Sequence, residues 1–117
     1  MDIKSCRYYD GNGNEYIINS TPKFTIEYNP VTPLESSSGI YDGGEYVKGE
    51  ISEQLYNKTI LIIGNIIKNR EILINDRVKG SGMIIFQDED KEDSYILKPS
   101  SKEIDKIEEL LHELIRN

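Results

Sequence analysis

The pattern of apolar and polar positions is densest in the middle of the chain, across residues 51–69 (ISEQLYNKTILIIGNIIKN). On a helix that begins after Ser52, the apolar residues form a wide stripe with a polar back, as expected of a helix lying across a sheet. Only Leu61 falls outside the stripe. Ser52 is a suitable N-cap residue, because its hydroxyl can accept from a free backbone N–H. The stripe consists of Leu55, Tyr56, Thr59, Ile60, Ile62, Ile63, Ile66 and Ile67.

The same stretch has a second interpretation, as a β-hairpin. Residues 59–63 are almost wholly β-branched, which suits a strand, and Gly64 with Asn65 could turn the chain into a second strand that ends at Ile74. We favour the helix because residues 53–58 are polar and tolerate a helix well. Both interpretations stay open on the sequence alone.

The N-terminal part of the chain alternates in the way that strands do. Residues 3–9 and 15–19 have strand composition, and residues 10–14 (DGNGN) between them are of the types that a tight reversal needs. Residues 23–28 (KFTIEY) alternate apolar and polar side chains, which is typical of a half-exposed strand. The sequence therefore predicts a hairpin followed by a third strand.

The second half of the chain predicts three more strands and a helix. Residues 70–75, 83–87 and 94–98 have strand composition and are joined by short polar links, which predicts an antiparallel meander. Ser100 and Glu103 have capping-box spacing. The residues that follow place an apolar stripe at helical spacing, which consists of Ile104, Ile107, Leu111 and Leu114.

Together these elements predict a single α+β domain over residues 1–117. In chain order it has an N-terminal β-hairpin and strand, a long irregular loop, a central helix, a three-strand antiparallel meander and a C-terminal amphipathic helix. Each helix has one apolar stripe, so we expect two helices on one face of an antiparallel sheet. A chain of 117 residues buries roughly two-thirds of the surface that it exposes when unfolded, which allows a core without covalent staples.

Charge and composition exclude several classes of protein. The formal net charge is −7, which argues against nucleic-acid binding through clustered Lys and Arg. No apolar run approaches the ~20 residues of a membrane span, and the first residues lack the apolar core of a signal peptide. A cytoplasmic protein is the simplest interpretation, although a secreted protein whose signal peptide had been removed would look the same.

Catalytic groups are scarce. His112 is the only histidine and is expected on the polar side of the C-terminal helix. Cys6 is the only cysteine and falls in the first predicted strand, where cysteine commonly acts as a small buried hydrophobe. Nothing places His112 beside Cys6 or beside the serines of residues 36–38, as a nucleophile and its base require. We therefore expect no enzyme and no cofactor.

Two acidic segments only partly resemble metal-binding loops. The turn that begins at Asp10 opens as D-x-N-x-N, like a calcium loop, but has Glu15 where the loop needs Gly and Thr21 where it needs Glu. The acidic link of residues 88–93 contains no glycine that would let it wrap around an ion. The sequence predicts no metal site.

Residues 30–50 form the least regular part of the chain, with a short edge strand possible at residues 45–48. Structureless connections of this length are uncommon in compact domains and are often functional or disordered. Tyr, Ser and Gly are also the residues that binding loops favour. Alternatively, the tyrosines fold back on the body of the protein. The candidate binding residues are Ser36, Ser37, Ser38, Gly39, Tyr41, Asp42, Gly43, Gly44 and Tyr46.

These features favour a non-catalytic, small acidic binding protein of the bacterial accessory kind, such as an inhibitor or a toxin-neutralising, immunity-like protein. Its partner would be another protein, with neither nucleic acid nor membrane involved. The alternative is a small-ligand or metal-binding domain in which residues 30–50 serve as a lid. A pocket would favour the ligand-binding alternative, and a flat or protruding loop would favour the protein partner.

Overall fold

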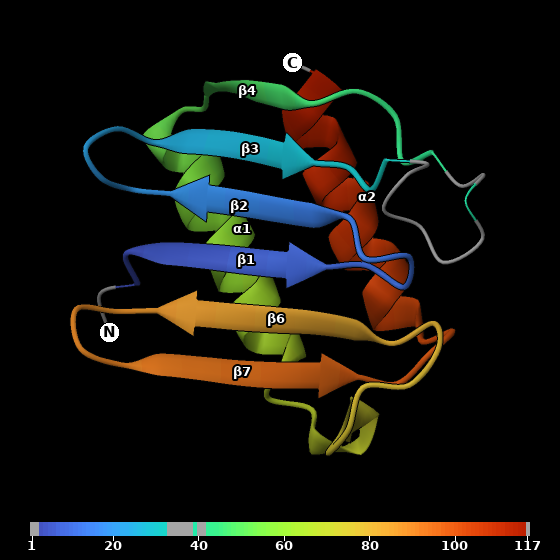
Figure 1. The fold of residues 1–117 in the computed structure, drawn as a ribbon. Coiled ribbons are helices and arrows are strands. Elements are labelled where there is room, and N and C mark those ends of the chain that lie inside the picture. The colour runs from blue at the N-terminus through green and yellow to red at the C-terminus, as the bar shows by residue number, and fades with distance from the viewer. Residues whose placement is uncertain (1–2, 33–38, 40–41, 117) are drawn as a thin grey trace.

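The computed structural model describes residues 3–32, 39 and 42–116. They form a seven-stranded antiparallel sheet with two α-helices behind it, on one face (Figure 1). The predicted α+β class and the placement of both helices on one face are confirmed. The elements are β1 (Ser5–Tyr9), β2 (Glu15–Asn19), β3 (Thr25–Asn29), β4 (Val47–Glu50), α1 (Glu53–Ile66), the 3₁₀ helix η1 (Arg70–Ile72), β5 (Leu73–Ile74), β6 (Gly82–Gln87), β7 (Glu92–Leu97) and α2 (Lys102–Arg116).

The strand order is β4-β3-β2-β1-β6-β7-β5. β1 lies at the centre of the sheet, where Tyr8 pairs with Tyr16 of β2 on one side and with Ile84 of β6 on the other. This central pairing joins the two halves of the chain. The predicted hairpin and third strand are confirmed, and the edge strand β4 lies two residues beyond the expected residues 45–48.

The predicted strand at residues 70–75 differs from the structure. Its first part is η1, because the Asn69 side chain accepts a hydrogen bond from the backbone N–H of Glu71 (3.2 Å) and so turns the chain after α1. Only Leu73–Ile74 is a strand. It pairs with β7 rather than with β6, since both edges of β6 are already occupied by β1 and β7.

The central helix is confirmed, and the hairpin interpretation of the same stretch is wrong. The Ser52 hydroxyl accepts from the backbone N–H of Leu55 (3.1 Å), as predicted for an N-cap. Thr59 is buried, and its hydroxyl donates to the carbonyl of Leu55 (2.7 Å), so its polar atom is satisfied inside the helix. Burial of a helical stripe therefore outweighs the β-branched preference of residues 59–63.

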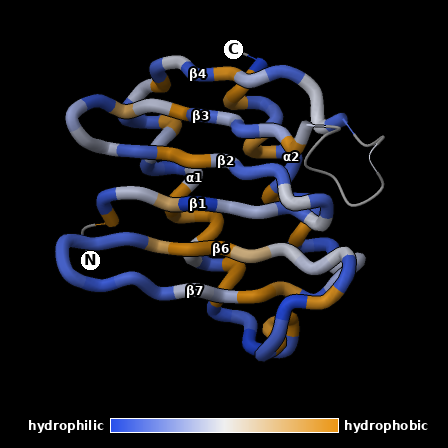
Figure 2. The backbone as a smooth tube through the Cα atoms, in the orientation of Figure 1, coloured by the Kyte–Doolittle hydropathy of each residue, from blue (hydrophilic) through white to orange (hydrophobic). Residues whose placement is uncertain are grey.

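The core lies between the helices and the covered face of the sheet, and orange apolar segments recur along the strands in Figure 2. The stripe of α2 is buried as predicted. Its N-cap is Ser101 rather than Ser100, because the Ser101 hydroxyl accepts from the backbone N–H of Ile104 (3.3 Å). The buried stripe of α2 consists of Ile104, Ile107, Leu111 and Leu114.

No helix among the described residues is long and apolar enough to cross a membrane.

Candidate functional site

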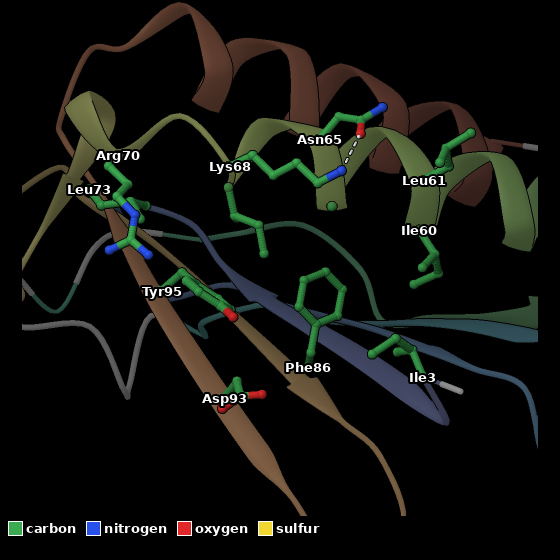
Figure 3. Close-up of a pocket in the computed structure, with 12 residues that line it drawn as sticks. Ile3, Ile60, Leu61, Asn65, Lys68, Arg70, Leu73, Phe86, Asp93 and Tyr95 are labelled. Atoms are coloured by element: carbon green, nitrogen blue, oxygen red, sulfur yellow. Dashed lines mark hydrogen bonds between the residues drawn. The ribbon is translucent and has the colours of Figure 1, made fainter. Parts of the chain in front are cut away.

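A crevice of about 560 Å³ lies between the C-terminal half of α1 and the part of the sheet formed by β6, β7 and β5. Figure 3 shows its residues projecting from the helix on one side and from the strands on the other. Its walls are mostly apolar, and its polar groups lie at the rim. The lining residues are Ile3, Ile60, Leu61, Gly64, Asn65, Ile67, Lys68, Arg70, Leu73, Phe86, Asp93 and Tyr95.

The crevice exists because α1 contacts the sheet through only part of its surface. Tyr56, Thr59 and Ile63 are the buried residues of the helix. Leu61 lies on the adjoining flank with 65% of its surface exposed, although leucine usually lies inside. The sheet beneath this flank leaves it uncovered.

Gly64 keeps one wall of the crevice open. No atom outside its local neighbourhood lies within 4 Å of the place where a Cβ would be, so tight packing does not require glycine here. A glycine inside a helix costs about 1 kcal/mol relative to alanine. Gly64 therefore lowers the stability of the helix and leaves space open at the crevice wall.

Two aromatic rings form the floor. Phe86 of β6 and Tyr95 of β7 both face the helices, with ring centroids 6.2 Å apart and planes at 69°, an edge-on arrangement. Such pairs add about 0.5–1.5 kcal/mol beyond their buried area. The floor is therefore a fixed apolar surface.

The rim carries two cations and one carboxylate. Lys68 follows the end of α1 and donates from Nζ to Oδ1 of Asn65 at 3.5 Å, which is a long contact. Arg70 is the first residue of η1. Asp93 of β7 is the cross-strand partner of Phe86 in β6. Within the described ranges, neither Lys68 nor Arg70 has a carboxylate oxygen within ion-pair distance. The ion pairs between described residues are Lys4–Glu89, Arg7–Glu92 and Lys23–Glu50.

The binding residues predicted from the sequence that the structure describes lie outside the crevice lining. Ser36, Ser37, Ser38 and Tyr41 fall outside the described residues. The described parts of their segment lead from β3 to β4, whereas the crevice lies over β6 and β7. Three strand spacings of about 4.8 Å separate β3 from β6, or about 14 Å. The described part of the predicted loop is therefore separate from the crevice, and we do not assign that part as a lid of this crevice.

Near the β1–β2 turn, the segment is anchored by Asn14. The Asn14 side chain accepts from the backbone N–H of Val31 (2.8 Å), and the carbonyl of Val31 accepts from the N–H of Gly43 (2.8 Å). Tyr28 donates to the carbonyl of Gly43 (2.5 Å). A Cβ on Gly43 would lie 2.1 Å from Oδ1 of Asn14, so a side chain does not fit without displacing Asn14. Gly43 is a structural anchor.

Tyr46 projects from the same segment and is 54% exposed. Its hydroxyl donates to Oε2 of Glu27 (2.6 Å), and this hydrogen bond raises the pKa of the phenol. Glu27 alternates with the buried Ile26 and Tyr28, so Tyr46 lies over the sheet face opposite the helices. Asp42 caps a turn by accepting from the N–H of Gly44 (3.0 Å), and Gly39 is exposed.

His112 makes side-chain contacts that the sequence did not predict. It is exposed, yet its Nε2 lies 2.7 Å from the hydroxyl of Tyr16, with ring centroids 5.8 Å apart. One helical turn earlier, Glu108 accepts from the hydroxyl of Tyr8 (2.7 Å). Burial raises the pKa of Glu108, although the hydrogen bond from Tyr8 opposes the shift. These contacts fasten α2 to the sheet.

Cys6 is buried, as expected. Its burial raises the pKa of the thiol to about 12, and the thiolate is the nucleophilic form of cysteine. Cys6 is therefore a packing residue and an unreactive one at neutral pH.

The Asp10 carboxylate is used within its own turn. Oδ1 accepts from the backbone N–H groups of Asn12 and Asn14 (both 2.9 Å), and Oδ2 accepts from the Asn14 side chain (2.8 Å). In the part of the chain that the structure describes, no three His, Cys, Asp or Glu side chains cluster in a way that would hold a metal ion. The D-x-N-x-N pattern here builds a turn.

No protein-family model matches the chain, and no curated protein or solved structure is significantly similar to it. Its site must therefore be interpreted from its own residues. Two features of the sequence coincide with the crevice, although neither predicted it. Leu61 lay outside the apolar stripe, and Gly64 interrupted a helix that it did not end. Sequence reasoning missed the site because neither feature names the strands that form the opposite wall.

Proposed function

We propose that the protein is a non-catalytic binding protein and that the crevice beneath α1 is its ligand site. The observation that carries the proposal is the crevice itself, with apolar walls and polar groups confined to the rim. Its volume of about 560 Å³ falls within the range of about 300–1,000 Å³ that is common for small-molecule sites. The exposed Leu61 and the side-chain-free Gly64 support a surface kept open for a ligand.

The non-catalytic part of the proposal rests on the lining residues. The titratable groups that line the crevice are Lys68, Arg70, Asp93 and Tyr95. Cys6 is buried with a raised thiol pKa, and His112 contacts Tyr16 on the α2 side. A nucleophile paired with a general base, which covalent catalysis requires, is not among the crevice residues.

Filling the crevice tests the proposal. Nile red, an uncharged dye that fluoresces in apolar surroundings, should bind the wild-type protein and lose binding in Gly64→Leu, because the leucine side chain would occupy the open wall. Gly64→Ala is the matched control, since it also replaces the helical glycine but adds a single methyl group. Equal dye binding by all three proteins, with Gly64→Leu folded, would overturn the assignment of the crevice.

A second candidate is a protein-binding function of the inhibitor or toxin-neutralising kind. It is favoured by Tyr46, a residue that is 54% exposed on the sheet face opposite the helices, because tyrosine is frequent among the residues that dominate protein interfaces. This function would use a different face from the crevice. The two candidates therefore predict different sensitive residues, Tyr46 for the partner and Gly64 for the small ligand.

A further inference from the structure

We propose that the ligand of the crevice is a free anionic amphiphile, with its apolar chain between α1 and the aromatic floor and its anionic head between Lys68 and Arg70. This inference rests on the proposed function and adds the chemical class of the ligand. The crevice walls are mostly apolar, so they suit a hydrocarbon body. Its rim supplies the charge that would select the head.

The two cations at the rim of the crevice favour an anionic head. The chain has 14 basic side chains, and among the described residues only Lys4, Arg7 and Lys23 form ion pairs, so Lys68 and Arg70, like most described cations, have no carboxylate partner. In Figure 3 both side chains start from the α1 and η1 side of the crevice, and Lys68 extends toward Asn65 while the Arg70 guanidinium extends toward Tyr95. An anion placed near them would complement two cations that have no carboxylate partner among the described residues.

Two negatively charged groups near the crevice would repel an anion. The C-terminal end of α1 carries about half a negative charge, and Asp93 also lines the crevice. Asp93 projects from β7, on the sheet side of the crevice in Figure 3, away from the end of α1. Two full positive charges on the helix side exceed the helix-end charge, so the head is expected there, and Asp93 is expected to weaken binding.

The test compares decanoate with decanol, which have the same chain and differ in the charge of the head. Each titration is followed calorimetrically in wild type and in the double variant Lys68→Gln/Arg70→Gln. We expect wild type to bind decanoate about five- to tenfold more tightly than decanol, since an exposed charge pair contributes up to about fivefold. The double variant should lose this preference and bind decanol as wild type does.

Two further variants sharpen the result. Asp93→Asn should strengthen decanoate binding severalfold and leave decanol unchanged, because it removes a like charge from the lining. Lys58→Gln is the matched control, since it removes one cation from an exposed position of α1 outside the crevice lining. Its preference for decanoate should equal that of wild type.

The outcomes separate the two proposals. If decanol binds and decanoate binds no more tightly, the anionic head is refuted and the crevice site stands. If neither binds, the proposed function fails as well. A loss of preference in Lys58→Gln equal to that in the double variant would refute a local head site. Binding that occurs only to vesicles containing anionic lipid, and not to free decanoate, would also overturn the inference.

Discussion

The two helices lie on the same face of one sheet, yet they cover it differently. α2 lies over a row of tyrosines on neighbouring strands, Tyr8, Tyr16 and Tyr28, whose adjacent ring centroids are 6.1 and 4.7 Å apart. Polar contacts from Glu108 and His112 close over two of their hydroxyl groups. α1 instead leaves its outer flank uncovered, and a crevice of about 560 Å³ remains beneath it.

The difference divides one face of the sheet into a closely covered half, which we call the structural half, and a partly uncovered half, which we propose to be the binding half. On the α2 side, every large apolar residue of the stripe is buried, and tyrosine hydroxyl groups find partners at the edge of the core. On the α1 side, a helical glycine lowers stability without improving packing, and Leu61 is left exposed. We therefore expect substitutions on the α2 side to change stability strongly, and those on the crevice side to change binding.

Removing α2 should have the largest effect. Deletion of residues 101–117 removes four buried aliphatic side chains, each worth about 1.5–3 kcal/mol, against a total stability of about 5–15 kcal/mol. The truncated chain should show no cooperative thermal transition by circular dichroism. A sharp transition near that of the full chain would show that α2 is not the structural half.

A matched pair of leucine substitutions compares the two halves directly. Leu111→Ala should lower the free energy of unfolding by about 2–5 kcal/mol, because Leu111 is 1% exposed and its removal leaves a cavity. Leu61→Ala should change it by no more than about 0.5 kcal/mol, since the side chain is mostly in solvent. Urea titrations of both variants give the two values. Equal losses would remove the distinction between the halves.

Gly64→Ala should raise stability by up to about 1 kcal/mol, because alanine is the better helix former and the added methyl group meets open space. The gain should appear as a higher urea midpoint with an unchanged slope. A loss of stability would mean that the wall of the crevice is already packed.

Glu108→Gln should stabilise the protein at neutral pH by less than about 1 kcal/mol, since the carboxyl group is only partly buried. The folded state raises the pKa of Glu108, so it binds the proton more tightly than the unfolded chain does. Below about pH 4.3 the carboxyl group is protonated in the folded and the unfolded state, so its burial does not lower the free energy of unfolding. The free energy of unfolding then falls as the pH rises through the pKa of the folded state. Melting curves should therefore show the gain at pH 7 and lose it at pH 4.

Tyr46→Ala should have the smallest effect on stability, within about 0.5 kcal/mol, because its ring is largely exposed and its partner Glu27 lies on the open sheet face. Thermal melts of Tyr46→Ala and Tyr46→Phe would measure it. A loss above about 1 kcal/mol in the alanine variant alone would show that the ring packs on the sheet. The contact-surface interpretation of Tyr46 would then be wrong.

Local patterns predicted most of the fold, because helix stripes, helix caps and strand alternation each depend on residues that are close together in the sequence. Ser52 and the stripe of α2 are examples. The position of β5 was not predictable in this way, because it depends on β6 having both edges occupied by distant strands. The N-cap of α2 was misplaced by one residue, since Ser100 and Ser101 offer the same chemistry.

The candidate site was harder to predict, because its two walls come from distant parts of the sequence. Leu61 lay outside the predicted stripe and Gly64 was a candidate hairpin turn, whereas Phe86 and Tyr95 join them only through the β1–β6 and β6–β7 pairings. Arg70 reaches the rim because η1 turns the chain, where a strand had been expected. Composition instead favoured residues 30–50, whose described part is anchored at Asn14.

The most direct test of the crevice as the binding site is a map of amide chemical shifts during titration with decanol, an uncharged probe. We predict that the largest shifts fall on Leu61, Gly64, Leu73 and Tyr95, and that Tyr46 and Leu111 stay unchanged. Shifts concentrated at residues 42–46, or no saturable shifts in the crevice, would contradict the account.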